Sequence, residues 1–344
     1  MTAAPVAVIG GGSWGTALAV HLGRLGLAPR LWARDATLVG LMRSKRENPW
    51  YLPGIPLRET LAVTSDLAEV LRGVGLAIVA VPSHAFDAVM EAAAPRLGGE
   101  VTILSATKGL EPERSRRMSE IARARCPGSP IAVLSGPTFA REVALGLPTA
   151  AVVASADPPV ATALQHRLSS PEFRLYTNRD VLGVEIGGAI KNVMAIATGI
   201  SDGLGLGENA RAALITRGLA EITRLGVALG ASPATFAGLA GIGDLVLTCT
   251  GSLSRNHALG LALARGKTFE QARGETRMVA EGARTSRSAT ALARQTGVAL
   301  PICEEVAAVL FERKTPREAL ATLLQREPRA EEEPLPATSS PRGR

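Results

Sequence analysis

The chain has 344 residues with a formal net charge of +7; 46% of the residues are hydrophobic and only 3% are aromatic. This length favours two domains, whose interiors would be built mainly from Ala, Val, Leu and Ile. The basic residues are scattered and not interleaved with aromatics, which argues against a nucleic-acid partner, and no run of about 18 apolar residues predicts a membrane span.

The first half of the chain alternates short apolar runs with helical patterns. The runs expected to form strands are residues 5–9, 28–32, 76–81, 101–105, 131–134 and 149–154, and a helix is expected over 16–25. Strand and helix in this rhythm predict an α/β fold with a doubly wound (Rossmann) parallel sheet.

Strand signals fade after about residue 180, where long helical patterns take over. The expected helices cover residues 181–198, 210–229, 286–295, 304–311 and 317–324. We therefore expect a dinucleotide-binding Rossmann domain over 1–182 and an all-helical substrate and catalytic domain over 183–326. The polar, Pro-rich residues 327–344 predict a disordered tail.

The start of the chain and its cysteines bear on location and metals. Residues 1–5 lead straight into a strand pattern, without the basic and apolar regions of a signal segment. The three cysteines, Cys126, Cys249 and Cys303, are far apart and show no metal-ligand spacing. We expect a cytoplasmic protein without a metal.

A Gly-rich turn directly follows the first strand. Gly10, Gly12 and Gly15 match the G-x-G-x-x-G spacing, and a strand precedes them while a helix follows. In such turns the first glycine permits a tight turn, the second lets backbone approach a pyrophosphate, and the third lets helix and strand pack closely. The turn predicts a bound dinucleotide.

The end of the second strand predicts which dinucleotide is used. An acid at this position favours NAD and an arginine favours NADP. The chain has both, Arg34 followed by Asp35. Arg34 favours NADPH as the preferred cofactor, and use of both cofactors stays open.

The second half holds candidate catalytic groups. Lys191 is the only charged residue between Ile186 and Ser201, and a lysine removed from water has a lowered pKa that suits proton transfer. Asp244 is a lone acid in an apolar stretch, either a helix cap or a partner for a cation or a substrate hydroxyl. Ser254, Arg255 and Asn256 form either a phosphate-binding group or a solvated turn.

Together these motifs resemble bacterial NAD(P)-dependent sn-glycerol-3-phosphate dehydrogenase over about residues 5 to 325. The resemblance is carried, in order, by Gly10-Gly-Gly-Ser-Trp-Gly-Thr-Ala-Leu-Ala, Val81-Pro-Ser-His, Ala106-Thr-Lys-Gly-Leu-Glu, Ser135-Gly-Pro-Thr-Phe-Ala, Gly188-Ala-Ile-Lys-Asn-Val, Asn209-Ala-Arg-Ala-Ala-Leu-Ile-Thr-Arg-Gly, Gly243-Asp-Leu-Val-Leu-Thr-Cys-Thr and Ser254-Arg-Asn. It implies reduction of dihydroxyacetone phosphate to sn-glycerol 3-phosphate with NAD(P)H, a step that feeds phospholipid synthesis.

The resemblance also implies roles for individual residues. Lys191 would be the proton donor and acceptor. The cofactor would be bound by the glycines of the turn and by Ser13, Trp14, Arg34, Lys108, Ala140, Arg255, Val279 and Glu281. The substrate would be bound by Lys108, Gly136, Thr138, Lys191, Asp244, Ser254, Arg255 and Asn256. Ala280 stands where the family usually has glycine or a similar small residue.

Two rival interpretations remain at this point. One is a related Rossmann dehydrogenase acting on a 3-hydroxy acid or a ketopantoate-like substrate, where a helix lysine followed by asparagine also occurs. The other is a non-catalytic NAD(P)H-sensing module, which would not need Lys108, Lys191 and Asp244 together. The apolar helices of the second domain suggest a homodimer.

Overall fold

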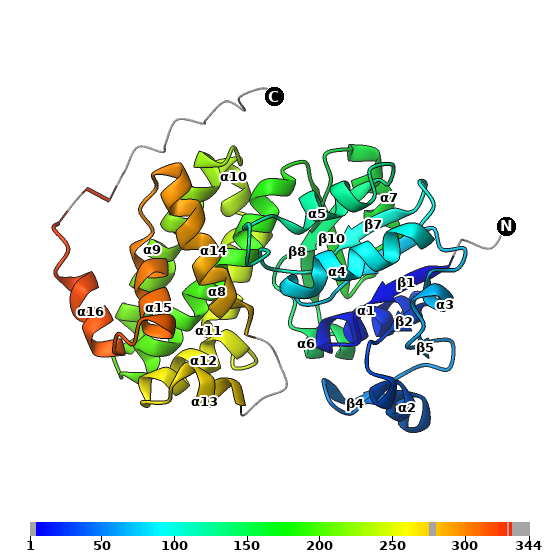
Figure 1. Cartoon of the computed structure of the whole chain (residues 1–344), viewed down its shortest axis with the longest axis horizontal. Helices are drawn as coiled ribbons and strands as arrows, with labels where there is room; N and C mark the ends of the chain where they lie inside the picture. Colours follow the sequence, from blue (N-terminus) through cyan, green and yellow to red (C-terminus); the bar gives the residue numbers. More distant parts are fainter. Residues whose placement is uncertain (1–4, 275–279, 329, 332–344) are drawn as a thin grey trace. The chain divides into compact units, whose positions relative to one another are not determined.

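The chain forms two compact units. The computed structural model describes residues 5–274, 280–328 and 330–331 (Figure 1). Unit 1 comprises Met1–Thr107 and Met118–Val181, and unit 2 comprises Lys108–Arg117 and Leu182–Arg344. The segment Lys108–Arg117, which the sequence pattern placed within the dinucleotide-binding part, thus groups with the helical unit. Most of the predicted tail lies outside the described residues.

Unit 1 is built on one eight-stranded sheet with the strand order β10-β9-β8-β7-β6-β1-β2-β5. Its strands are β1 (Val6–Ile9), β2 (Arg30–Trp32), β5 (Ala62–Thr64), β6 (Leu76–Val79), β7 (Thr102–Ser105), β8 (Ile131–Ser135), β9 (Thr149–Ala154) and β10 (Phe173–Asn178). The stretch from β5 to β8 is parallel and has the strand order of a doubly wound nucleotide-binding sheet. The predicted fold class is confirmed.

The parallel expectation fails at one end of this sheet. β9 pairs antiparallel with β8, and β10 then pairs parallel with β9. These two strands therefore run opposite to the other six. An apolar run shows that a strand is buried but carries no sign of its direction, so the sequence pattern could not reveal this reversal.

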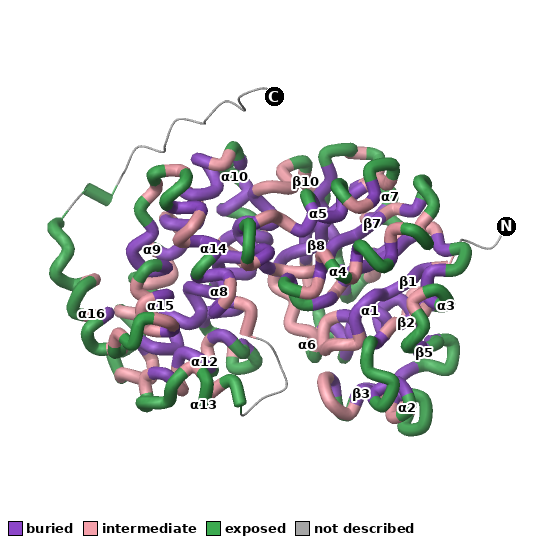
Figure 2. The backbone as a smooth tube through the Cα atoms, in the orientation of Figure 1, coloured by how far each residue is buried: buried purple, intermediate pink, exposed green. Residues whose placement is uncertain are grey.

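Helices cover both faces of the sheet, as the alternation along β1 shows. Val6 and Val8 belong to one hydrophobic cluster, and Ala7 and Ile9 belong to another on the opposite face. All four residues are buried, as expected for a central parallel strand (Figure 2). The helices are α1 (Ser13–Arg24), α2 (Ala36–Lys45), α3 (Leu67–Leu71), α4 (Ser83–Ala93), α5 (Met118–Arg125), α6 (Ala140–Leu145) and α7 (Pro158–Leu168), with a 3-10 turn at Ala94–Arg96 and a small ribbon of β3 (Glu47–Asn48) and β4 (Leu52–Pro56).

Unit 2 is helical and has its own core. Its helices are α8 (Val181–Gly203), α9 (Gly207–Ala228), α10 (Pro233–Phe236), α11 (Asp244–Thr250), α12 (Arg255–Ala264), α13 (Phe269–Gly274), α14 (Glu281–Thr296), α15 (Pro301–Phe311) and α16 (Pro316–Leu324), with a π-type segment at Leu239–Gly243. Glycines let α8 and α12 pack closely, because a Cβ at Gly199 would lie 2.1 Å from the carbonyl oxygen of His257, and one at Gly260 would lie 2.2 Å from that of Ile196. The α12 backbone is thereby fixed against α8.

Two stretches of unit 2 have the length and apolar composition of a membrane span, Val181–Gly203 and Pro233–Thr250. In the first, 83% of the apolar window is buried inside the protein. Buried core helices commonly have this length and apolar composition, and the packing of α8 described above accounts for its apolar character.

Candidate active site

The Gly-rich turn between β1 and α1 has the geometry that its three glycines predict. Gly10 has a φ of 133°, and a Cβ there would lie 2.5 Å from the carbonyl oxygen of Ala80. A Cβ at Gly15 would lie 1.9 Å from the Gly10 carbonyl oxygen, so this glycine allows the helix to pack directly on the turn. A Cβ at Gly12 would meet nothing within 4 Å, which leaves space for a ligand to approach.

The amino end of α1 is suited to an anion. Gly12 is the N-cap, no side chain caps the helix, and its first turn holds no acid. The Ser13 hydroxyl donates to the Tyr51 carbonyl oxygen (2.7 Å), and the Trp14 indole N–H donates to the Ala106 carbonyl oxygen (3.1 Å). Both side chains hold the turn in place, so the backbone amides are the groups left to face a pyrophosphate.

Arg34 and Asp35 differ in what their side chains do. Asp35 is the N-cap of α2, and its carboxylate accepts from the Leu38 N–H (3.1 Å). Arg34 is exposed, and among the described residues its guanidinium has no hydrogen bond or ion pair. The acid is therefore committed to a helix end, while the arginine remains available to a ligand.

Three further candidates of unit 1 lie just after β8. Gly136 has a φ of 130°, and a Cβ there would lie 3.0 Å from the Cα of Ala151. The Thr138 hydroxyl donates to the Gly136 carbonyl oxygen (3.0 Å), which holds this turn. Ala140 is the first residue of α6, whose N-terminus also lacks a side-chain cap.

The central feature of unit 2 is a carboxylate between two lysines. Lys191 on α8 donates to Oδ1 of Asp244, and Lys108 donates to Oδ2 of the same residue (2.8 Å). Lys191 is 5% exposed and Asp244 is 1% exposed. The sequence left open whether Asp244 caps a helix or pairs with a cation or a substrate hydroxyl. In the structure it pairs with two cations, Lys191 and Lys108.

Burial sets the protonation chemistry of Lys191. Desolvation lowers the pKa of its ammonium to about 7, and the neighbouring Lys108 lowers it further, while Asp244 opposes both effects. An amine with this pKa can both give and take a proton near neutrality, as a general acid–base group must. The closeness of Ala240 to Gly187 contributes to this burial, since a Cβ at Gly187 would lie 2.6 Å from the Ala240 carbonyl oxygen.

Thr248 completes this cluster, and sequence reasoning gave it no role. Its hydroxyl accepts from Lys191 (2.7 Å) and donates to the backbone carbonyl of Asp244 (2.6 Å). The available signal was its spacing, because a residue four positions after Asp244 lies on the same face of a helix. Lys191 is thus held from two sides.

The start of α12 joins three helices through amide groups. Ser254 is the N-cap and accepts from the His257 N–H (3.2 Å). Asn256 donates to the side-chain oxygen of Asn192 (2.8 Å) and accepts from the Gly282 N–H (2.9 Å). Asn192, which directly follows Lys191 on α8, is thereby linked to α12 and, through Asn256, to α14. Sequence reasoning gave Asn192 no role. Arg255, at the first helical position, is exposed.

The remaining candidates have simpler positions. Glu281 is the first residue of α14, and Val279 lies outside the described residues. The three cysteines are free and buried, and burial raises the pKa of Cys249 to about 12, which agrees with a packing role. The described residues contain no group of three or more His, Cys, Asp or Glu side chains that could hold a metal.

The chain combines a dinucleotide-binding turn on a doubly wound sheet with a helical unit that contains a buried lysine whose pKa is about 7. This combination defines an NAD(P)-dependent dehydrogenase with a Rossmann domain and a helical domain. The model of the NAD-dependent glycerol-3-phosphate dehydrogenase N-terminus matches residues 5–161, and that of the C-terminus matches residues 180–321. The chain belongs to this glycerol-3-phosphate dehydrogenase family.

Individual relatives agree with this assignment. A glycerol-3-phosphate dehydrogenase (NAD(P)+) of Citrifermentans bemidjiense is 53% identical, over 95% of this chain and 98% of its own length. The crystal structure of glycerol-3-phosphate dehydrogenase from Coxiella burnetii has a TM-score of 0.92 at 43% identity and covers 94% of this chain and 99% of its own. A ketopantoate reductase from Ralstonia eutropha, with a TM-score of 0.60 and 15% identity over 93% of this chain and 100% of its own, shares the fold alone.

Proposed function

We propose that Lys191 is the proton donor in an NAD(P)H-dependent reduction of dihydroxyacetone phosphate to sn-glycerol 3-phosphate. The chain is an NAD(P)-dependent oxidoreductase acting on a CH–OH group, and its product serves glycerophospholipid synthesis. The main support for this proposal is the buried Lys191–Asp244–Lys108 cluster, in which burial lowers the pKa of Lys191 to about 7. The ketopantoate-type alternative finds support in the fold only.

The cluster provides the groups that ketone reduction needs. The reduced nicotinamide, when bound, supplies the hydride. As the ketone oxygen gains negative charge, the ammonium of Lys191 stabilises it and then gives it a proton. Asp244 and Thr248 orient the amine, and Lys108 adds a second positive charge beside the same carboxylate.

The start of α12 is our candidate for the substrate phosphate. Arg255 provides a permanent cation, and the backbone amides of the first turn provide donors that suit a phosphate. The Ser254 hydroxyl and the Asn256 amide would add donors while they keep their structural bonds. Phosphate binding away from the ketone carbon helps to orient it. Gly136 and Thr138 remain proposed substrate contacts from unit 1.

The cofactor residues are proposed on the same basis. The open space at Gly12 and the uncapped amino end of α1 fit a pyrophosphate, with Ser13 and Trp14 contributing through their backbone. Lys108, Ala140, Arg255, Val279 and Glu281 complete the proposed cofactor set. We place the protein in the cytoplasm, and a homodimer stays a prediction that sedimentation analysis can check.

Substitution of Lys191 tests the central proposal. We expect Lys191→Ala to lower kcat by roughly 10²- to 10⁴-fold, the usual contribution of a general acid, and to leave the Kd for NADPH unchanged. Lys191→Arg keeps the charge but cannot release a proton near neutrality, so its kcat should stay low as well. Folded wild-type protein that fails to oxidise NADPH when given dihydroxyacetone phosphate would refute the assigned reaction.

Arg34 is the proposed determinant of a preference for NADPH. Its guanidinium, which has no partner within the part of the chain that the structure describes, suits a 2′-phosphate, whereas Asp35 is occupied as a helix cap. We expect Arg34→Ala to raise the KM for NADPH about tenfold and to leave the KM for NADH nearly unchanged, as loss of a charge-assisted bond predicts. Arg96→Ala, at another exposed arginine of unit 1, is the matched control. An equal rise for both cofactors would contradict the proposal.

A further inference from the structure

The loop of residues 108–117 brings Lys108 to Asp244 without the support of a helix or a strand. The structure describes the whole loop, which lies between β7 and α5 and has one isolated bridge, between Leu110 and Arg117. The Lys108 ammonium nevertheless donates to the Asp244 carboxylate (2.8 Å). A long lysine side chain loses conformational entropy when it is fixed in this way, so other contacts must hold the loop in place.

Repulsion between two lysines opposes the position of Lys108. Lys108 and Lys191 both donate to Asp244, so two ammonium groups share one carboxylate. The charge of Lys108 lowers the pKa of Lys191, which shows that the two groups repel each other at this separation. The pairing with Asp244 therefore does not by itself explain why Lys108 stays beside Lys191.

Glu111 gives the loop a fixed shape. Its N–H donates to the Arg116 carbonyl oxygen (2.9 Å), and its carboxylate accepts from the Arg116 guanidinium (2.7 and 3.2 Å). The same carboxylate accepts from the Arg114 N–H (3.1 Å). Because both ends of the loop are joined by these bonds, an anchor at residue 117 also restrains residue 108.

The loop is attached to α14 and to the core of unit 2. The Ser115 hydroxyl donates to the Ser288 carbonyl oxygen (3.4 Å), and the Ser288 hydroxyl donates to the Glu111 carbonyl oxygen (3.3 Å). Leu110 is fully buried in the helical core. These neutral contacts hold the middle of the loop.

An ion pair attaches the end of the loop to α8. The Arg117 guanidinium donates to the Glu185 carboxylate (3.0 Å), and these side chains are 19% and 6% exposed. Glu185 precedes Lys191 by six positions on α8, which corresponds to about 9 Å along a helix. The helix that carries Lys191 thus also anchors the loop that carries Lys108.

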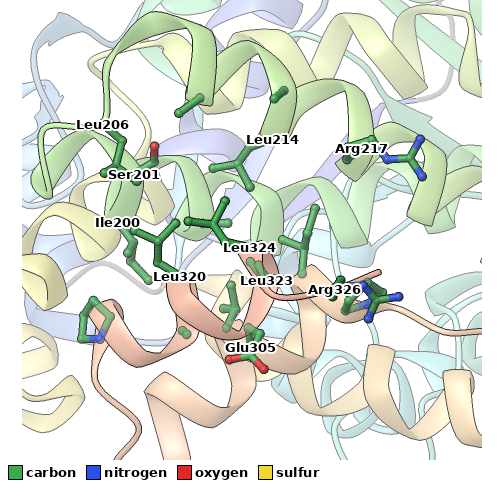
Figure 3. Close-up of a pocket in the computed structure, with 18 of the residues that line it drawn as sticks. Ile200, Ser201, Leu206, Leu214, Arg217, Glu305, Leu320, Leu323, Leu324 and Arg326 are labelled. Atoms are coloured by element: carbon green, nitrogen blue, oxygen red, sulfur yellow. The ribbon is translucent and has the colours of Figure 1, made fainter. Parts of the chain in front are cut away.

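The carboxyl-terminal part of α8 has other neighbours. Ile200 and Ser201 line an aliphatic pocket together with Leu214 of α9 and Leu320 of α16 (Figure 3). Among the described residues that line this pocket, none belongs to the loop. The contacts of the loop can therefore be changed without changing the pocket.

We propose that Arg117 and Glu185 are positioning residues, whose ion pair holds the loop so that Lys108 stays against Asp244 and beside Lys191. They act through Lys108 and are assigned no contact with cofactor or substrate. The inference deepens the proposed reduction and rests on it for the catalytic role of Lys191. Loss of the ion pair should let Lys108 move away from Asp244, while Leu110 still keeps the loop on the core.

The titration of Lys191 tests this role without any turnover. The chain has five lysines, so lysine side-chain NMR of the protein without ligands can follow each one, and Lys191→Arg identifies the Lys191 signal. Arg117→Met and Glu185→Gln should both raise the pKa of Lys191, by about half or more of the rise that Lys108→Ala causes, because the repulsion from Lys108 is weakened.

The other groups that act on Lys191 stay unchanged in these variants. Asp244 and Cys249 are the charged or titratable groups of α11 that affect its pKa, and the Thr248 hydroxyl accepts from it. Arg114→Met is the matched control, since this exposed arginine of the same loop bonds to Glu111 through its backbone. It should leave the titration of Lys191 as in wild type.

A double variant separates positioning from a general loosening of the core. In a Lys108→Ala background, Arg117→Met should cause no further change in the pKa of Lys191, because the group that it positions is gone. A loosened core would raise the pKa in both backgrounds, since water would reach Lys191. Arg117→Lys, which keeps the charge, should restore part of the wild-type titration.

Steady-state kinetics give a second readout. In Arg117→Met and Glu185→Gln, the falling limb of kcat for ketone reduction should move to higher pH, and the KM for dihydroxyacetone phosphate should rise roughly threefold to tenfold, since Lys108 is a proposed substrate contact. A shifted titration in protein that does not reduce dihydroxyacetone phosphate would refute the assigned reaction and support the positioning role. An unshifted titration in both variants, with a Tm that shows folded protein, would overturn the proposal, and so would equal shifts with and without Lys108.

Discussion

At Lys191, opposing effects bring an amine that normally titrates far above neutrality into the working range. Burial and Lys108 lower its pKa to about 7, and Asp244 limits the shift. A lysine exposed on the same helix would stay fully charged and would release its proton poorly. The apolar sequence around Lys191 is therefore part of the chemistry, since it supplies the desolvation.

The direction of catalysis should depend on pH accordingly. Ketone reduction needs the protonated lysine, so its kcat should fall as pH rises through about 7, while alcohol oxidation should rise through the same range. Asp244→Asn removes the charge that raises this pKa, so the falling limb should move to lower pH. Asp157→Asn, at an exposed acid of unit 1, should leave the limb in place. A limb that does not move in Asp244→Asn would remove Asp244 from the control of Lys191.

At the scale of elements, the turn between β1 and α1 separates packing from binding. Gly10 and Gly15 are required by backbone contacts, whereas Gly12 has an ordinary φ of −77° and open space where its Cβ would be. In this motif Gly10 and Gly15 are therefore needed for backbone packing, and we expect Gly12 to be needed for the approach of the ligand.

Gly12→Ala should therefore impair the cofactor and not the fold. The new methyl group would occupy the space that a pyrophosphate needs, so we expect the Kd for NADPH to rise at least tenfold with a Tm within about 2 °C of wild type. Gly40→Ala, at another glycine with nothing within 4 Å of the built Cβ, is the control for affinity: it should leave the Kd unchanged, while alanine in the middle of α2 should raise the Tm slightly. Unchanged affinity in Gly12→Ala would show that the cofactor does not approach this residue.

The helices and strands that could be predicted from the sequence are those with a clear apolar run or a regular spacing of apolar residues. β1, β6 and β9 were visible as short apolar runs, whereas β5 has only three residues and β10 alternates buried and exposed positions in a polar setting. The short helices α10 to α13 were missed for the same reason. Lys191 and Asp244 were recognisable as lone charges among apolar neighbours, but Thr248 and Asn192 look like ordinary helix residues until their partners are known.

At the scale of the whole molecule, the helical unit is not one continuous piece of chain. Lys108–Arg117 belongs to it, although the flanking segments belong to unit 1. Within unit 2, Leu110 is fully buried in the helical core, and Arg117 pairs with Glu185 (3.0 Å). A ten-residue loop without helical or strand periodicity gave no sequence signal for this assignment.

A fragment of residues 182–328 should consequently fail to fold stably. It removes Lys108, one of the two cations of Asp244, and Arg117, which pairs with Glu185, and breaking a buried pair costs about 3–5 kcal/mol, a large part of the stability of a domain. Joining 108–117 to its amino end through a short Gly/Ser linker should restore cooperative thermal unfolding of its helical circular dichroism. The same fusion carrying Leu110→Asp should not. Cooperative unfolding of the bare fragment would contradict this dependence.

The indole of Trp14, anchored at the dinucleotide turn, also makes the protein its own optical probe. Trp14, Trp32 and Trp50 are the three tryptophans of the chain, and all belong to unit 1. Indole emission overlaps the absorption of reduced nicotinamide, so binding of NADPH should quench the native fluorescence by energy transfer. Because the helical unit contributes no emission of this kind, the quenching would report cofactor affinity even in Lys191→Ala, where turnover can report nothing.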